Sequence, residues 1–221
     1  SQLLPRPVWL WNVAVKGKPL TFGNLADAVP SARDLNAFKT WVDSQFDPTV
    51  TWTDIAWLRD LWRGKLLLKG ILEVDDALSA VQVGADGIVV SNHGGRQLDG
   101  VASTATKLPA IVNAVGDRTD VLVDGGIRSG VDVFRALALG AKGVLIGRPW
   151  IWALAAEGEA GVRRLLNSWQ QELRLAMTLT GVTRIADIGA AQLDTAHANG
   201  AATTAPGSAI SSQSFPPNST L

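Results

Sequence analysis

Between residues 65 and 181, short apolar runs alternate with stretches whose apolar residues recur at helical spacing. Four of the runs are continuous, as is typical of parallel strands that are buried on both faces. These predicted strands occupy residues 65–69 (KLLLK), 87–91 (GIVVS), 121–124 (VLVD) and 143–146 (GVLI). Their composition predicts four central strands rather than edge strands.

The segments between the runs have the pattern of amphipathic helices. In the first, the apolar residues at i, i+3, i+4 and i+7 are Val74, Ala77, Leu78 and Val81. In the segment after the third run, Ser129 is the expected N-cap, with Asp132 three residues later and Gly140 at the C-terminal turn. A last helix is predicted over residues 161–178.

Alternating strands and helices predict a parallel α/β sheet with right-handed crossovers. Four units fit either a doubly wound sheet or half of a (β/α)8 barrel. On each side of them the composition changes. Residues 1–60 are Trp-rich and irregular with a lead-in helix, residues 61–188 carry the alternation, and residues 189–221 are poor in large apolar residues. We expect this last segment to be disordered.

The chain has 221 residues, 20 basic and 20 acidic side chains, and no Cys. A net charge of zero provides no field for a nucleic-acid backbone, so we expect no nucleic-acid partner. Without Cys there is no thiolate metal site and no cysteine nucleophile, and we expect no metal. A base of near-neutral pKa has to be His93 or His197, and His197 lies in the predicted tail, where we give it no role.

Polar or glycine residues follow every predicted strand, where parallel α/β proteins bind their ligands. They are Lys69; Ser91, Asn92, His93 and Arg96; Asp124, Gly125, Gly126, Ile127 and Arg128; and Gly147 and Arg148. The glycines and arginines of the last two loops predict an anion site, because backbone N–H groups and guanidinium groups both bind phosphate. The alternative is that both loops are ordinary tight turns.

Two further positions predict chemistry at the same edge. Lys69 ends a buried run, which places a cation at the mouth of the site, unless its side chain extends to solvent. His93 and Arg96 lie three residues apart, a spacing at which a base and a carboxylate-binding guanidinium can serve one small substrate. The alternative for His93 is a structural or exposed histidine.

The sequence SNHGGRQLDG, with LLLKGI before it and LVDGGIRSGVDVFRALALGAKGVLIGRP after it, resembles the FMN-dependent α-hydroxy-acid dehydrogenase and oxidase family. The resemblance covers residues 52–188, and its flanking segments are most similar to the bacterial respiratory L-lactate dehydrogenase branch. It implies the C-terminal half of a (β/α)8 TIM barrel that holds FMN and oxidises an L-2-hydroxy acid, L-lactate first, to the 2-oxo acid.

The resemblance also implies roles for individual residues. His93 matches the catalytic base, Arg96 matches the arginine that binds the substrate carboxylate, and Lys69 matches the lysine beside the flavin N1/O2 edge. Other positions match the residues that contact the flavin, its ribityl chain and its phosphate. They are Ser91, Asp124, Gly125, Gly126, Ile127, Arg128, Gly147 and Arg148.

The chain departs from the family pattern in having no Tyr, whereas the family uses two active-site tyrosines, a second arginine and an aspartate from its first four strands. We therefore expect a fragment with little or no activity by itself. Two other hypotheses remain: a non-catalytic half-barrel that binds a phosphate ligand or a partner subunit, and another phosphate-binding barrel enzyme, such as an isomerase, which does not explain His93 and Arg96.

The stretch PVWLWNVAV matches the family's variable loop, which docks onto the bilayer in membrane-associated members. Its two Trp beside Arg6, Lys16 and Lys18 suit a membrane interface, and the alternative is that they pack on the barrel. The resemblance implies a cytoplasmic protein with peripheral contact to the inner face of the cell membrane. It also implies a quinone or another electron acceptor, and a homo-oligomer in the full-length form.

Overall fold

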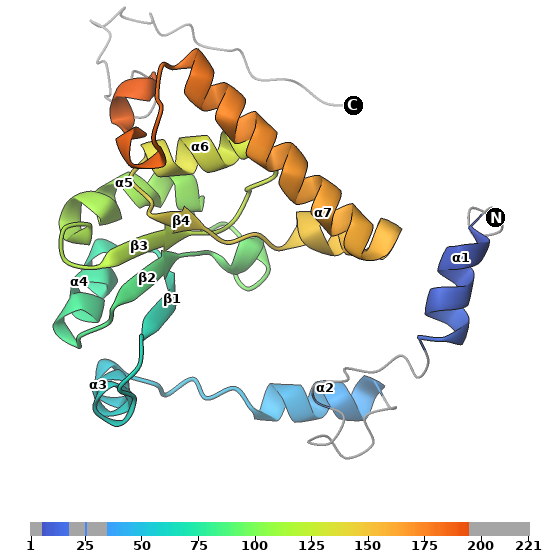
Figure 1. The fold of residues 1–221 in the computed structure, drawn as a ribbon. Coiled ribbons are helices and arrows are strands. Elements are labelled where there is room, and N and C mark those ends of the chain that lie inside the picture. Colours follow the sequence, from blue (N-terminus) through green and yellow to red (C-terminus); the bar gives the residue numbers. More distant parts are fainter. Residues whose placement is uncertain (1–5, 18–24, 26–34, 195–221) are drawn as a thin grey trace, which may run out of the picture.

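The computed structural model describes residues 6–17, 25 and 35–194. Four strands form a parallel sheet in the order β1-β2-β3-β4 (Figure 1). The strands are β1 (Leu67–Ile71), β2 (Gly87–Val90), β3 (Asp120–Val123) and β4 (Gly143–Val144). The crossover helices are α4 (Val74–Gln82), α5 (Thr104–Val115) and α6 (Gly130–Ala138), and α7 (Arg148–Leu179) follows β4. The predicted α/β class with four parallel strands and flanking helices is confirmed.

The prediction that all four strands are central is wrong for this chain. Within the described sheet, β2 and β3 have a neighbour on each side, whereas β1 and β4 are its edges. Every residue of β2 is buried, but most of β1 is exposed or half-buried. An apolar run indicates that a strand is suited to a buried position between two neighbours. The sequences of β1 and β4 suit such a position, but the described residues provide no strand on their outer sides.

One face of the sheet packs against α4 and α5. Because side chains alternate along a strand, Ile88 and Val90 point to this face while Val89 and Ser91 point to the other. The fully buried members contributed by the two helices are Ala77, Ala80, Leu108, Ile111 and Val115. The predicted stripe of the first helix is therefore confirmed as a core-facing stripe, with Val74, Leu78 and Val81 packed around the buried alanine.

A second apolar cluster joins α6 to α7 and to the segment after it, and α7 runs across α6 in Figure 1. Phe134 and Ala138 of α6 are buried against Val182 and Ile188. The two helices approach closely at Gly130, where an added Cβ would lie 2.6 Å from the Leu173 nitrogen. The close approach therefore requires glycine at this position.

The predicted N-cap of α6 is confirmed. The Asp132 backbone N–H donates to Ser129 Oγ at 3.0 Å. The Asp132 carboxylate, however, accepts from the Arg128 backbone N–H at 3.0 Å rather than from Ser129. Gly140, at the C-terminal turn, has the left-handed φ of +100° that the prediction requires.

The described parts of residues 1–60 are more helical than their irregular composition suggested. They contain α1 (Pro7–Leu10), the π-helical turn Trp11–Val15, α2 (Leu35–Ser44) and α3 (Trp52–Leu61). The capping box of α3 explains its start, because the Asp54 carboxylate accepts from the Thr51 backbone N–H at 2.7 Å. Trp9 Nε1 donates to the Ala155 carbonyl of α7 at 3.0 Å.

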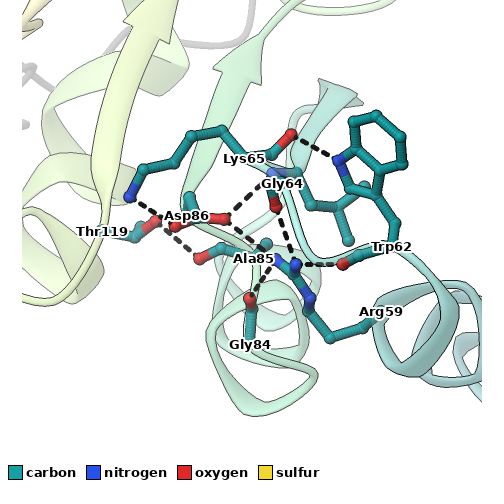
Figure 2. Close-up of polar contacts among 9 residues, drawn as sticks. Arg59, Trp62, Gly64, Lys65, Gly84, Ala85, Asp86 and Thr119 are labelled. Carbon is teal, nitrogen blue, oxygen red and sulfur yellow. Dashed lines mark hydrogen bonds and ion pairs between the residues drawn. The ribbon is translucent and has the colours of Figure 1, made fainter.

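Helix α3 is connected to the amino ends of the strands by the hydrogen bonds of Asp86, as Figure 2 shows. Its carboxylate accepts from Arg59 Nη1 at 2.9 Å, from Lys65 Nζ at 2.7 Å and from the Leu66 backbone N–H at 2.9 Å. The hydrogen bond from Lys65, with those from Leu66 and Arg59, lowers the pKa of Asp86 to about 2. β1 begins at Leu67, two residues later than predicted.

After α7, the chain forms two 3₁₀ turns, Ile185–Asp187 and Ala190–Gln192. Leu193 packs against the α6–α7 cluster, so ordered structure extends past the predicted boundary at residue 189. The rest of the predicted tail, with His197, lies outside the described residues. None of the described helices combines the length and the apolar character that crossing a bilayer requires.

Candidate functional site

The residues predicted to carry chemistry lie at one edge of the sheet, because all three strand pairs are parallel and their carboxyl ends coincide. Lys69 was expected at the end of its strand, but it lies inside β1 opposite Val89. A bulge at Gly70, with φ +98°, follows it and shifts the register by one residue. Lys69 therefore reaches the carboxyl edge through the length of its side chain.

The Lys69 ammonium joins two of the predicted site residues. Lys69 Nζ donates to Ser91 Oγ at 2.8 Å and forms an ion pair with Asp124 Oδ2 at 2.8 Å. Ser91 is almost fully buried, and the Asp124 side chain is 16% exposed. Lys69 of β1 therefore forms one cluster with Ser91 and Asp124, which directly follow β2 and β3, and we call it the Lys69 cluster.

Two polar groups of the Lys69 cluster remain unsatisfied within the described residues. Ser91 Oγ accepts from Lys69 Nζ and from the His93 backbone N–H at 3.1 Å, which uses both of its lone pairs and leaves its O–H free to donate. Asp124 Oδ1 is buried and has no hydrogen-bond partner. A buried group of this kind costs free energy unless a ligand or water satisfies it. The cluster thus fits a ligand that has both hydrogen-bond donors and acceptors.

The loop after β2 presents the predicted base. His93 has φ +55°, which is unusual for a residue other than glycine, and Gly94 and Gly95 continue the left-handed run. His93 and Arg96 are both exposed. No carboxylate forms an ion pair with His93 among residues 6–17, 25 and 35–194. Within these ranges, the His93 imidazole therefore has no carboxylate partner that would orient it.

The turn after β3 brings Asp124, Gly125 and Gly126 to the same edge, and Gly125 has φ +87°. Thr104, the first residue of α5, is buried and donates from Oγ1 to the Asp124 carbonyl at 2.6 Å. An added Cβ on Gly125 would lie 3.1 Å from this hydroxyl. Sequence reasoning missed Thr104. A threonine directly after the Ser103 N-cap is the signal that could have suggested it.

Two helices start beside the predicted anion site, and they differ in whether their N-terminal N–H groups are free to bind an anion. At α6, the Gly130 and Asp132 amides donate to Glu172 Oε2 at 2.6 Å and to Ser129 Oγ, so protein acceptors already occupy this helix start. At α7, Gly147 is the N-cap and no side chain caps the helix. An added Cβ on Gly147 would meet nothing within 4 Å. An anion can therefore approach the N-terminus of α7.

Arg128, Arg148 and Ile127 are the other residues of the predicted anion site. Arg128 and Arg148 are exposed, and within the described part of the chain neither forms an ion pair. Arg148 is the first residue of α7, and Arg128 precedes the Ser129 N-cap of α6. Ile127 packs at the border of the core and contributes an apolar contact rather than a polar one.

Comparisons with known proteins identify the family to which the chain is similar. A family model described as FMN-dependent dehydrogenase matches residues 1–195. The chain is 56% identical over 183 residues to an L-lactate dehydrogenase of Caulobacter vibrioides, covering 83% of this chain and 48% of that protein. It is 53% identical over 189 residues to an L-lactate dehydrogenase of Stenotrophomonas maltophilia, covering 86% and 50%. The chain thus spans about half the length of these curated relatives.

Solved structures of mandelate oxidase are also similar. One, with the monooxide FMN adduct, is 54% identical with a TM-score of 0.60, covering 62% of this chain and 44% of that chain. Another, with benzoyl-formic acid, is 55% identical with a TM-score of 0.59, covering 60% and 40%. The family model matches most of the chain, and the curated relatives are more than half identical to it over the matched region. The chain belongs to the FMN-dependent dehydrogenase family.

Proposed function

We propose that this chain supplies the C-terminal half of an active site that oxidises an L-2-hydroxy acid, L-lactate first, to the 2-oxo acid with FMN. The observation that carries the proposal is the Lys69 cluster with its two unsatisfied polar groups. The relatives named L-lactate dehydrogenase support L-lactate as the substrate. Since the chain spans about half of those relatives, the complete activity requires the other half of the site.

The residues present fit FMN. The Lys69 ammonium suits the electron-rich N1/O2 edge of a flavin, and the Ser91 hydroxyl has a proton free to donate beside it. Asp124 Oδ1 can accept from a ribityl hydroxyl. The uncapped start of α7 at Gly147, with Arg128 and Arg148, suits the phosphate. When bound, FMN accepts the two electrons that the substrate loses.

The other polar residues act on the substrate. Oxidation of a 2-hydroxy acid removes two electrons and two protons. The His93 imidazole would take one proton as general base, and bound FMN would take the two electrons and the other proton. The Arg96 guanidinium binds the substrate carboxylate through two parallel hydrogen bonds and so orients the hydroxyl-bearing carbon. The Lys69 ammonium would stabilise negative charge on a reduced cofactor held beside it.

The phosphate assignment can be tested by comparing FMN with riboflavin, which lacks the phosphate. Flavin fluorescence is titrated with the chain and with its Arg148→Gln variant. We expect FMN to bind at least tenfold more tightly than riboflavin, and Arg148→Gln to lose most of this preference without changing riboflavin affinity. Arg174→Gln, an exposed arginine on the same helix without an ion pair within the described residues, is the matched control. Equal affinity for the two flavins rejects the phosphate site.

We further propose a peripheral membrane contact, a cytoplasmic location, a quinone acceptor and a homo-oligomer for the full-length form. Exposed Val8, Trp11 and Val15 on the N-terminal helical segment support the membrane contact. Lys16 lies beside them, with its Nζ 6.0 Å from the centroid of the Trp11 ring. Flotation with anionic liposomes tests it: the chain should float, and Trp11→Ser together with Val15→Ser should prevent flotation. A chain that stays with the unbound protein contradicts the proposal.

A further inference from the structure

The loop that carries His93 is held in an unusual conformation. His93, Gly94 and Gly95 have φ values of +55°, +67° and +69°, three consecutive left-handed residues. Such backbone costs free energy for a residue with a Cβ and persists only where neighbouring groups fix it. The polar contacts around the loop therefore show which residues determine where the imidazole lies.

Two side chains, those of Ser91 and Asn92, make those contacts. Ser91 Oγ accepts from the His93 backbone N–H, and Ser91 already belongs to the Lys69 cluster. Asn92 Oδ1 accepts from the Gly95 backbone N–H at 3.2 Å, and the Asn92 carbonyl accepts from the same N–H at 3.0 Å. The Asn92 carboxamide thus closes the loop between residue 92 and residue 95.

Asn92 also touches the two neighbouring segments of the site. Its Nδ2 donates to the Ala102 carbonyl, at the long distance of 3.5 Å, just before α5. Its Oδ1 would lie 3.4 Å from a Cβ added to Gly125, in the turn after β3. The carboxamide therefore lies between the loop of the base and the turn that carries Asp124, and its half-buried position leaves it little freedom.

From these contacts we propose that Asn92 is a positioning residue for the base, an inference that rests on the proposed role of His93. Asn92 does not touch the reacting atoms. Its Oδ1 holds the Gly95 N–H, this contact stabilises the left-handed backbone of residues 93–95, and that backbone fixes the location of the His93 imidazole. The hydrogen bond to Gly95 is the essential one, and the longer bond to Ala102 contributes less.

Two substitutions separate these bonds. Asn92→Ala removes both side-chain hydrogen bonds and leaves the backbone bond from the Gly95 N–H to the carbonyl of residue 92. Asn92→Asp keeps the side-chain oxygen that accepts from Gly95 and loses the donor to Ala102. Backbone chemical shifts of His93, which report the sign of φ, and hydrogen exchange of the Gly95 amide are measured by NMR in the full 221-residue chain. Asn113→Ala, an exposed asparagine on α5, is the matched control.

We expect Asn92→Ala to move the His93 shifts away from left-handed values and to accelerate Gly95 exchange about fivefold. Asn92→Asp should keep the His93 shifts of the parent chain and a Gly95 exchange rate within about twofold of the parent rate. Asn113→Ala should change neither readout. Unchanged His93 shifts in Asn92→Ala, or equal changes in Asn92→Asp and Asn92→Ala, overturn the inference about Asn92. If Asn92→Ala does not fold, Asn92→Asp alone decides, since it has to retain the parent His93 shifts.

These readouts do not depend on catalysis, so they separate this inference from the proposed function. If the NMR result is as expected but no flavin binds to the parent chain, the proposed function fails and Asn92 keeps its role in fixing the loop. If flavin binds and the NMR result is negative, the proposed function stands and the positioning role is wrong.

Discussion

Lys69 is the residue on which the candidate site depends most. Its ammonium is half-exposed, yet it contacts a buried hydroxyl and a largely buried carboxylate from the next two strands. Without it, Asp124 keeps a charge with no partner in the described residues, and the flavin edge has no cation. Loss of Lys69 should therefore weaken cofactor binding, and it should also destabilise the fold by leaving a largely buried carboxylate unpaired.

We predict that Lys69→Met weakens FMN binding roughly tenfold or more, because one charge-assisted hydrogen bond contributes about 1.5–3 kcal/mol. The measurement is titration of flavin fluorescence. Lys142→Met is the matched control, since Lys142 is exposed and its side chain forms no ion pair within the described residues. FMN affinity that is equal in Lys69→Met and in the parent chain contradicts the role of Lys69 in the site.

Some contacts of these residues could be predicted from the sequence, and others could not, for physical reasons. Lys69, Ser91 and Asp124 could be predicted to converge because the ends of parallel strands share an edge. The position of Thr104 after the N-cap could suggest a buried hydroxyl, but its partner could not be predicted, because that partner is a backbone carbonyl that no side-chain pattern records. The protection of the Arg128 amide by Asp132 was missed for a related reason: the capping pattern predicts a partner for the Asp132 carboxylate, but not which of two adjacent amides it selects.

Among the elements, α3 is attached to the sheet through one carboxylate. Asp86 accepts from Arg59 of α3 and from Lys65 and Leu66, which precede β1 (Figure 2). A carboxyl whose pKa is lower in the folded than in the unfolded chain stabilises the fold above its unfolded pKa. That contribution is lost as pH falls from about 4, the ordinary value, to about 2, the value for Asp86.

We predict that Asp86→Asn lowers the urea midpoint of unfolding at pH 7, and that the difference from the parent chain shrinks as pH falls from about 4 toward 2. Urea unfolding followed by circular dichroism at pH 7, 4 and 3 measures this difference. Asp60→Asn, an exposed carboxylate on the same helix, should show little change at any pH. A difference that stays constant down to pH 3 contradicts the role of ionised Asp86.

The contact between α6 and α7 depends on Gly130. An added Cβ would lie too close to the Leu173 nitrogen and to the Trp169 carbonyl oxygen, both backbone atoms that cannot move alone. We predict that Gly130→Ala destabilises the chain by about 2–3 kcal/mol, as overpacking does elsewhere. Gly189→Ala is the control, since its Cβ would meet nothing within 4 Å. Urea midpoints that agree between Gly130→Ala and the parent chain show that the helices are not closely packed there.

At the scale of the whole molecule, the described chain is a sheet with two open edges. Strands β1 and β4 each pair on one side, although their sequences suit a buried setting. The order of strands and helices could be predicted from the sequence because each element carries its own periodicity. The edges could not, because a strand's sequence does not state which neighbours the chain provides.

This half-site predicts low activity for the chain alone. His93 lacks an orienting carboxylate within the described residues, and the flavin would have protein on one side. We expect the isolated chain to bind FMN weakly and to oxidise L-lactate little or not at all, as measured by bleaching of the flavin absorbance under anaerobic conditions. Ample bound FMN and rapid turnover by the isolated chain contradict this expectation.

The most direct measurement uses a chimera in which the chain is joined to the complementary amino-terminal half of the Caulobacter vibrioides relative. The chain itself is 56% identical to that relative over 183 residues. Addition of L-lactate to the FMN-loaded chimera should bleach the flavin absorbance. His93→Gln should slow bleaching at least a hundredfold while the bound flavin is retained, and His197→Gln should behave like the parent chimera. Bleaching at the parent rate in His93→Gln, or none at all in a flavin-loaded parent chimera, contradicts the proposed role of His93 and of this half of the site.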